Sequence, residues 1–252
     1  MSVMRTLLRF AVVLPLVLGS LGAAPPDSLG SLGGHWRCAV AGGRPAERSY
    51  FPVTAKTGPA AGRRQVFGRE DTTEPDGAPS TSFERMVENV GGDISIASVE
   101  GQGTAANATP LRFAGRAYDG DATMEIAYAI SGDTMRRTAK RGAATVDDET
   151  CTREPEPQPI ASCPRPDVPA QTLRTIEPTT PLEAYAAKVK GLVQVRVVLD
   201  DRSRVLWADV VSSASPLFND VAVQAARGST FRTATVNCRP VASEYIFSVD
   251  FE

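Results

Sequence analysis

The chain of 252 residues carries 27 basic and 29 acidic side chains, which gives a formal net charge of -2. A chain so close to neutral has no overall field that would attract nucleic acid or an anionic membrane surface, and residues 162–252 taken alone are equally balanced. We therefore expect no nucleic-acid partner. Hydrophobic residues make up 42% of the sequence, which is enough to form the cores of two domains of ordinary size.

The N-terminus has the pattern of a secretory signal peptide. Arg5 and Arg9 precede an unbroken apolar or small stretch over residues 10–21, and the small residues 22–24 follow it. This stretch is shorter than the roughly 20 apolar residues that a membrane-spanning helix needs. We therefore expect residues 1–24 to be a cleaved signal peptide, with retention as an inner-membrane anchor as the alternative.

The sequence favours disulfide bonds over a metal site. The four cysteines are Cys38, Cys151, Cys163 and Cys238. An even number of cysteines in an exported chain pairs in an oxidising compartment. Zinc sites favour closely spaced ligands and histidine, whereas these cysteines are scattered and His35 is the single histidine. We expect no metal and no other cofactor.

A proline-rich segment divides the chain. Residues 154–161 contain alternating prolines, which exclude a helix and favour an extended linker. The sequence thus predicts one domain over residues 31–153 and a second over residues 162–252. Because the linker separates the cysteines two and two, the simplest pairing joins Cys38 to Cys151 and Cys163 to Cys238.

The first half is predicted to be all β. Residues 31–153 contain short alternating runs separated by Gly, Asp, Asn or Pro, with almost no helical periodicity. Besides strands near Trp36 and Cys151, the runs are residues 48–53, 64–67, 82–87, 93–99, 111–118, 123–130 and 134–140. Eight or nine strands of this length predict an up-and-down barrel, because closure removes exposed sheet edges.

The second half is predicted to be α+β. Roughly helix-spaced apolar residues over 180–190 precede a hairpin of strands at 192–200 and 204–212. Ser215 and Pro216 then begin a helix that extends to residue 228, and residues 241–251 alternate as a last strand. This order predicts an antiparallel three-stranded sheet with two helices.

The residues indicate no catalytic site. Serine-triad and metal-dependent hydrolysis need a histidine in most forms, and His35 lies beside a tryptophan of the expected barrel. Residues 101–106 fit a G-x-G-x-x-A pattern, but Pro110 breaks the helix that would hold a dinucleotide. We expect a protein that is not an enzyme.

Three residues of the first half resemble a known type of barrel. Gly34-His35-Trp36 resembles the G-x-W opening of lipocalin-type barrels, in which the tryptophan closes one end beneath a basic residue of the last strand. Arg153 is the residue that this resemblance places over Trp36. The resemblance implies a lipocalin-like barrel that holds a small apolar ligand at its mouth, although the other lipocalin motifs are missing.

The second half resembles the C-terminal domain of the TonB family. The matched blocks, in chain order, are residues 178–181 (PTTP), 191–195 (GLVQV), 210–214 (VVSSA), 219–227 (NDVAVQAAR) with Phe231 and Ala234, and 237–241 (NCRPV) with 249–251 (VDF). They are similar to the family patterns G-x-V-x-V, V-x-S-S-G, D-x-A-A-x-x-A-A-R and F-x-P-A. The resemblance covers about 90 residues, implies the family's α+β fold, and indicates the envelope of a Gram-negative bacterium.

The resemblance implies a protein partner at the last strand. In the family this strand offers its edge to an extended segment of an outer-membrane receptor. The residues that match it here are Val241, Glu244, Tyr245, Ile246, Phe247, Ser248 and Val249. We therefore expect a periplasmic protein-binding domain linked to TonB-type transmembrane transport, with a small-ligand carrier or sensor based on the barrel as the alternative.

The linker sets a limit on this expectation. Energy transducers of the TonB family keep an uncleaved membrane anchor and a long proline-rich spacer. A proline-rich segment of about seven residues extends only about 20 Å at roughly 3.1 Å per residue, which does not bridge two membranes. The expectation is therefore a binding protein, because this linker is too short for a transducer that bridges the two membranes.

Overall fold

The computed structural model describes residues 28–40, 45–58, 60–74, 76–118, 120–158, 160, 162–164 and 167–252. The predicted signal peptide over residues 1–24 lies outside the described residues. Within the described ranges, no helix is both long enough and apolar enough to cross a membrane. Of the linker predicted at residues 154–161, the described residues belong to neither a helix nor a strand.

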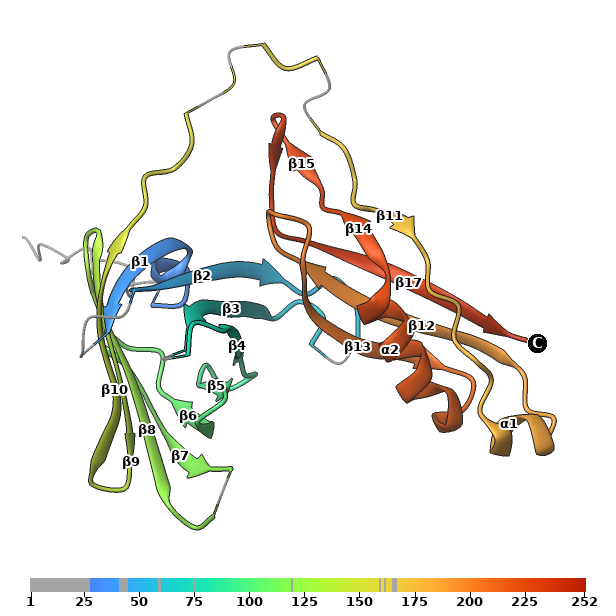
Figure 1. Ribbon diagram of the computed structural model, residues 1–252, viewed down its shortest axis with the longest axis horizontal. Coiled ribbons are helices and arrows are strands. Elements are labelled where there is room, and N and C mark those ends of the chain that lie inside the picture. The colour runs from blue at the N-terminus through green and yellow to red at the C-terminus, as the bar shows by residue number, and fades with distance from the viewer. Residues whose placement is uncertain are drawn as a thin grey trace, which may run out of the picture.

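The first half of the chain forms a closed antiparallel barrel of ten strands (Figure 1). Neighbours in the barrel follow one another in the chain, and pairing of the last strand with the first closes the ring. The strands are β1 (Gly34–Val40), β2 (Pro45–Thr54), β3 (Arg64–Thr73), β4 (Pro79–Glu88), β5 (Ile94–Ala97), β6 (Gly101–Ala105), β7 (Leu111–Ala117), β8 (Thr123–Ser131), β9 (Thr134–Arg141) and β10 (Ala144–Arg153). Side chains that alternate along each strand point either into this barrel or away from it.

The barrel has one strand more than the upper number predicted. The strand that the pattern missed is β6, whose residues Gly101-Gln102-Gly103-Thr104-Ala105 lack the branched and aromatic side chains that mark strands. Its glycines are needed because β6 and β7 approach closely. A Cβ at Gly103 would lie 2.7 Å from the carbonyl oxygen of Ala114, and a Cβ at Gly115 would clash with the backbone of β6.

One end of the barrel is closed as the tryptophan motif predicted. The short 3-10 helix η1 (Gly30–Leu32) lies across this end, and the Trp36 indole N–H donates to the carbonyl oxygen of Leu32 at 2.8 Å. The Arg153 guanidinium carbon lies 4.0 Å from the centre of the Trp36 ring. The same guanidinium donates to the carbonyl oxygens of Ser31 and Gly33. The predicted stacking of Arg153 on Trp36 is confirmed.

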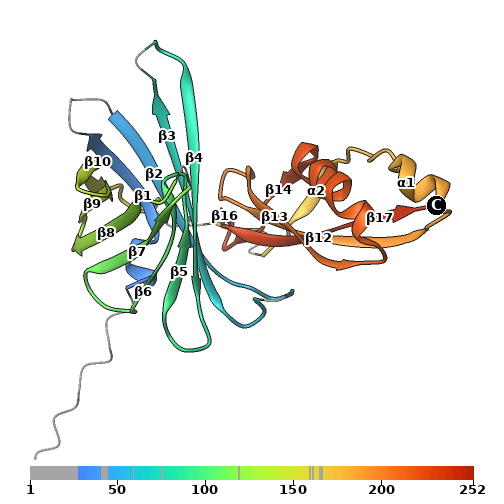
Figure 2. The ribbon, with the colours of Figure 1, turned by 90° about the horizontal axis from the view of Figure 1, so that it is seen from below.

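The described residues of the second half form seven further strands and one helix of more than two turns. The elements are β11 (Gln171–Arg174), α1 (Leu182–Ala186), β12 (Gly191–Leu199), β13 (Val205–Ser213), η2 (Pro216–Phe218), α2 (Asn219–Gly228), β14 (Thr230–Arg232), β15 (Thr235–Val236), β16 (Arg239–Pro240) and β17 (Ser243–Phe251). They form a three-stranded antiparallel sheet in the order β13-β12-β17 and two small sheets, β11-β14 and β15-β16. Figure 2 shows the three-stranded sheet edge-on, with α2 along one face and the barrel at one end.

The predicted fold class is wrong. The chain is an all-β protein dominated by its closed ten-stranded barrel, and the second half is not a separate α+β domain with two helices. The small sheet of β11 and β14 was not predicted, because its strands are short and about 60 residues apart in the sequence. The second half has an apolar cluster of its own, but Val198 and Leu206 of its sheet pack against the barrel wall.

The first predicted helix shrinks to a single turn. Residues 180–190 were expected to be helical, but α1 covers only Leu182–Ala186. Leu182 and Tyr185 are 77% and 75% exposed, so the apolar spacing does not correspond to a buried stripe. The backbone then turns left-handed at Lys188, with φ of 54°, and the chain enters β12. A helix of five residues has too few hydrogen bonds to be stable alone.

The helix α2 follows its sequence pattern. The Ser215 hydroxyl accepts from the Leu217 N–H, and Pro216 begins η2, which continues directly into α2. Ala222, Ala225 and Ala226 of α2 are buried against the sheet. Their small side chains let the helix approach the valines of β12 closely, which gives the three-stranded sheet one covered face.

An apolar cluster joins the sheet to the outside of the barrel. Phe51 of β2 and Phe67 of β3 lie on the outer barrel wall and pack with Val198 and Leu206 of the sheet. The Trp207 ring lies 6.2 Å from that of Phe67. Phe67 and Val198 are almost completely buried, so the contact removes a continuous apolar patch from water. A third apolar cluster, separate from the core of each half, therefore joins the two halves of the chain.

Ion pairs border this cluster. The Arg204 guanidinium lies 3.1 Å from the Asp71 carboxylate of β3. His35 Nε2 lies 2.7 Å from the Asp201 carboxylate in the turn between β12 and β13. The hydrogen bond to Asp201, more than any other influence, raises the pKa of the His35 imidazole. The only histidine of the chain thus ties the barrel to the sheet.

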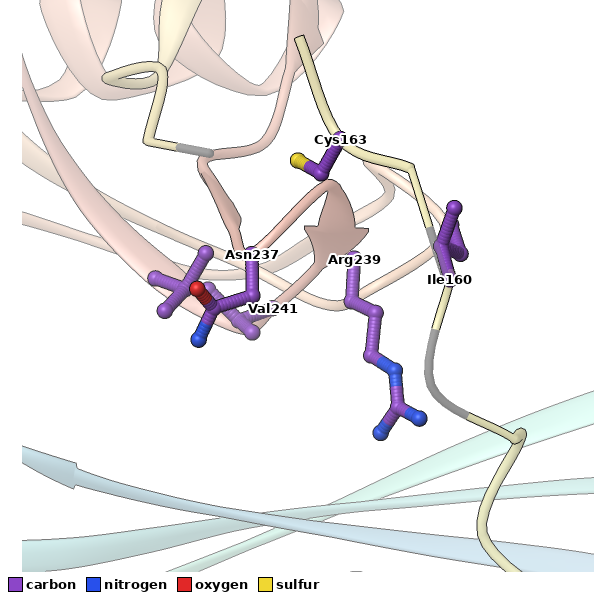
Figure 3. Close-up of a pocket in the computed structure, with 6 residues that line it drawn as sticks. Ile160, Cys163, Asn237, Arg239 and Val241 are labelled. Carbon is purple, nitrogen blue, oxygen red and sulfur yellow. The ribbon is translucent and has the colours of Figure 1, made fainter. Parts of the chain in front are cut away.

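Both disulfide bonds join the cysteines that the linker argument paired. Cys38–Cys151 joins β1 to β10 where these strands close the barrel, and both cysteines are buried. Cys163–Cys238 fastens the described residues after the linker to the turn between β15 and β16, and both of its cysteines are only half-buried. Cys163 also lines a hollow of about 550 Å³, together with Ile160 and Arg239 (Figure 3).

The difference in burial predicts an order of reduction. A soluble thiol must reach a sulfur atom to reduce a disulfide, so Cys163–Cys238 is expected to open before Cys38–Cys151. Titration of the folded protein with a mild reductant, followed by alkylation and peptide mapping, measures the order. Simultaneous opening of both bonds under native conditions would contradict it. Loss of the buried bond is expected to cost about 2–5 kcal/mol, the usual range for secreted domains.

Candidate functional site

The inside of the barrel holds a buried network of charges. The Arg48 and Arg137 guanidinium groups are 3% and 1% exposed. Both contact the Glu84 carboxylate, at 3.1 Å and 2.9 Å. Arg48 also contacts Glu149, and the Tyr128 hydroxyl donates to Glu84. Buried charges are stable only when they are paired and hydrogen-bonded, so these groups hold one another in place.

Large side chains fill the space around this network. The residues that are less than 2% exposed inside the barrel include Trp36, Tyr50, Met86, Phe113, Tyr128 and Arg137. A cavity beside Tyr128 and Leu111 at the barrel end has a volume of about 10 Å³, which is room for about one water molecule. Within the described residues, these side chains form a packed core inside the barrel.

The network contains more acid than base. Besides Glu84 and Glu149, the carboxylates of Glu70, Glu100 and Asp147 lie within ion-pair distance of the two arginines. Burial, and then the negative charge of Glu149, raises the pKa of Asp147 to about 6. The excess of carboxylates is thus relieved by protonation of Asp147 in mild acid.

A group of metal-ligand types also lies inside the barrel. The side-chain ligand atoms of Cys38, Cys151 and Glu149 lie within 4.8 Å of one another. Both sulfur atoms belong to the disulfide bond, so neither is a thiolate that can coordinate zinc. The group is part of the barrel's closure and is not a metal site.

The last strand, β17, lies at the edge of the three-stranded sheet. β17 pairs with β12 along its whole length, and in residues 167–252, which the structure describes without a gap, no strand pairs with its other side. Every predicted partner-edge residue except Val241 belongs to β17. Val241 precedes the strand and donates its N–H to the Ala234 carbonyl oxygen at 2.9 Å.

The direction of the backbone groups on β12 follows from two hydrogen bonds. The Leu192 carbonyl oxygen accepts from the Ala214 N–H at 3.0 Å, and the Asp200 N–H donates to the Arg204 carbonyl oxygen at 2.9 Å. Ala214 and Arg204 directly flank β13, so both bonds lie on the β13 side of β12. The even-numbered residues of β12 therefore direct their N–H and C=O groups toward β13. Because successive residues of a strand alternate in direction, the odd-numbered residues bond to β17.

The same alternation fixes the free edge of β17. Val195 stands opposite Phe247, and Val193 opposite Val249. The N–H and C=O groups of the odd-numbered residues of β17 therefore form hydrogen bonds with β12. The even-numbered residues direct theirs away from the sheet. The N–H and C=O groups of Ile246, Ser248 and Asp250 therefore form the free edge.

Two of the predicted edge residues serve other purposes. The Glu244 carboxylate lies 3.4 Å from the Arg196 guanidinium and accepts from the Lys56 N–H at 2.9 Å, which ties the start of β17 to the barrel. Phe247 is 4% exposed and packs with Phe231 in the core. The accessible part of the edge is therefore its distal part, around Ser248.

A groove follows this distal part of the edge. Its volume is about 600 Å³, and five consecutive residues of the chain, 248–252, form one wall. Consecutive residues of a strand point to opposite faces, so a groove that all of them line runs along the edge and not over one face. The other wall is an extended segment that includes Ile176 and Pro178.

The sequence missed this second wall. Residues 175–180 read as the lead into a helix, and nothing in their pattern indicates that they lie beside β17. Their position follows from β11, which pairs with β14, and from the Ile176 N–H, which donates to the Ser229 hydroxyl at 2.9 Å. Asp250 was also left out of the predicted site, although its alternation with Ser248 could have indicated it.

Comparison with known proteins adds no family. No protein-family model matches the sequence, and no curated protein matches it significantly. The candidate site is the free edge of β17 together with the groove beside it.

The pKa of Asp147 predicts a specific dependence of stability on pH. The folded state holds the Asp147 proton more tightly than the unfolded chain, because the pKa is raised from 3.8 to about 6. Ionisation of Asp147 therefore lowers the free energy of unfolding as the pH rises from about 4 to 7. In the Asp147→Asn variant this loss is absent, and the variant is expected to gain on the order of 1–3 kcal/mol relative to the parent over that range. Urea unfolding across pH measures this, and parallel profiles of the two proteins would contradict it.

The free edge predicts an alternating pattern of amide exchange. The amide protons of Tyr245, Phe247 and Val249 are expected to exchange slowly with solvent, because they bond to β12. Those of Ile246 and Ser248 are expected to exchange much faster. Hydrogen exchange followed by NMR measures each amide, and uniform protection along β17 would show that something already covers the edge.

Proposed function

We propose that this chain is a non-enzymatic, exported protein that binds a partner protein by adding an extended segment of that partner to the free edge of β17. The observation that carries the proposal is the unpaired row of backbone groups at Ile246, Ser248 and Asp250, the last two of which line a groove of about 600 Å³. In strand addition, main-chain hydrogen bonds supply affinity and the pockets beside them supply specificity.

The rigidity of the edge supports this proposal. The opposite side of β17 pairs with β12 over nine residues, and Phe247, Val249 and Phe251 anchor it in the core. The strand is therefore ordered before a partner arrives. Binding then costs little conformational entropy in β17, because only the partner segment has to become extended.

The residues that resemble the TonB C-terminal family support the proposal for the edge strand, although not for the fold. On that resemblance the partner is an envelope protein, and an outer-membrane receptor with an extended periplasmic segment is the specific candidate. The resemblance also places the protein in the periplasm, in a role linked to TonB-type transport. The two disulfide bonds are in keeping with an oxidising compartment.

The alternative of a ligand carrier has no comparable support. Such a carrier needs an apolar space of several hundred cubic ångströms that the ligand fills. Arg48, Arg137 and the large aromatic side chains instead occupy the described barrel interior.

A proline at Ser248 tests the proposed edge. The Ser248→Pro substitution removes one N–H from the free edge and no hydrogen bond to β12, so the fold is expected to persist. Affinity for peptides copied from the extended periplasmic segments of outer-membrane receptors is expected to fall about tenfold or more, since a buried, unpaired carbonyl group of the peptide costs about 1–3 kcal/mol. Calorimetry measures the affinity and circular dichroism the fold.

Two variants provide the controls. Ser248→Ala removes the hydroxyl group but keeps the N–H, so it is expected to bind like the parent protein. Phe247→Pro removes a hydrogen bond to β12 and is expected to unfold the sheet. If folded Ser248→Pro binds the peptides as tightly as Ser248→Ala, strand addition at this edge is wrong.

A further inference from the structure

The side chains that surround the free edge of β17 indicate which side chains a partner segment would need. An added strand would extend the sheet, so its side chains would alternate between the two faces of that sheet. Each of its residues would then lie beside the residues of β17 on the same face. The chemistry on each side of β17 therefore predicts the pattern of side chains in the partner.

On the face that carries α2, the β17 side chains beside the groove are apolar. Val249 and Phe251 are buried on this face, and Phe251 stacks on Phe218 with ring centres 4.1 Å apart. Ile176, which is 37% exposed, and Pro178 form the facing wall. Ile176 is thus partly exposed to water, and an apolar side chain that entered the groove would cover it. A partner residue directed to this face gains free energy if it is apolar.

The opposite face presents one exposed acidic side chain at the groove, that of Asp250. Ser248 and Asp250 are exposed there, and among the residues that the structure describes, Asp250 makes no ion pair. Glu177 and Glu252 also line the groove, and none of its ten lining residues is basic. A partner residue directed to this face gains free energy if it is basic, because opposite charges on neighbouring strands attract.

From these two faces we infer that the groove beside β17 binds an extended peptide in which apolar residues alternate with lysine or arginine. The inference rests on the proposed function and adds to it the chemistry of the partner. Apolar side chains occupy the space between Ile176 and Val249, and basic side chains lie beside Asp250.

Charge disfavours two of the registers in which a second copy of this chain could occupy the edge. If two β17 strands paired antiparallel about Phe247, Glu244 of each would stand opposite Asp250 of the other. If they paired about Ser248, Glu244 would stand opposite Glu252. Like charges directly opposite each other destabilise a strand pair, so both registers are unfavourable.

Two synthetic peptides test the inference with the purified, oxidised protein. One is an octapeptide of alternating valine and lysine, and the other an octapeptide of alternating valine and glutamate. The lysine peptide is expected to bind at least about tenfold more tightly and to slow amide exchange at Ile246, Ser248 and Asp250. Asp250→Lys is expected to reduce this preference severalfold. Asp93→Lys, an equal charge change on an exposed barrel loop, is expected to leave the preference unchanged.

The outcomes separate the inference from the proposed function. Equal affinity for both peptides, with protection of the same three amides, would overturn the basic pattern and leave strand addition standing. If neither peptide alters those amides, both ideas fail. Protection that rises with protein concentration in the absence of peptide, together with a doubled mass in solution, would show that a second copy occupies the edge and would overturn the inferred partner.

Discussion

The pairing of β1 with β10 determines where this chain can add a strand. This ladder closes the barrel, and Cys38–Cys151 lies within it, so all ten barrel strands have neighbours on both sides. A closed barrel has no edge to offer. The unpaired edges of the longer strands are therefore left to the three-stranded sheet, in which β12 is enclosed and β13 and β17 are not.

The barrel also determines which part of the sheet stays accessible. It covers the end of the sheet near the β12–β13 turn through Phe67, Val198 and Trp207, and it holds Glu244 through the Lys56 N–H. The C-terminal end of β17, which contains Ser248 and Asp250, extends away from the barrel (Figure 2). The barrel thus holds one end of the sheet in place. The exposed backbone and side-chain groups of the free edge lie at the other end.

Much of this arrangement could be predicted from the sequence, and the parts that could not share a physical cause. Alternation revealed most barrel strands, the β12–β13 hairpin and β17, because each has one buried face. The same signal failed for β6, where close strand approach requires glycine, and for α1, where apolar spacing did not lead to burial. The contact of Phe51 and Phe67 with the sheet could not be predicted either. In the sequence, an apolar residue that faces outward from a barrel cannot be told from one that faces inward. The position of Ile176 beside β17 depends on distant pairing that no local pattern encodes.

The two disulfide loops enclose residues 38–151 and 163–238, and β17 lies outside both. A partner segment that pulls along β17 would therefore meet no covalent cross-link, and the load would be carried by the nine residue pairs between β17 and β12. Because a force parallel to the strands shears these hydrogen bonds together instead of opening them one after another, the antiparallel ladder is a mechanically strong attachment for an edge strand of this length.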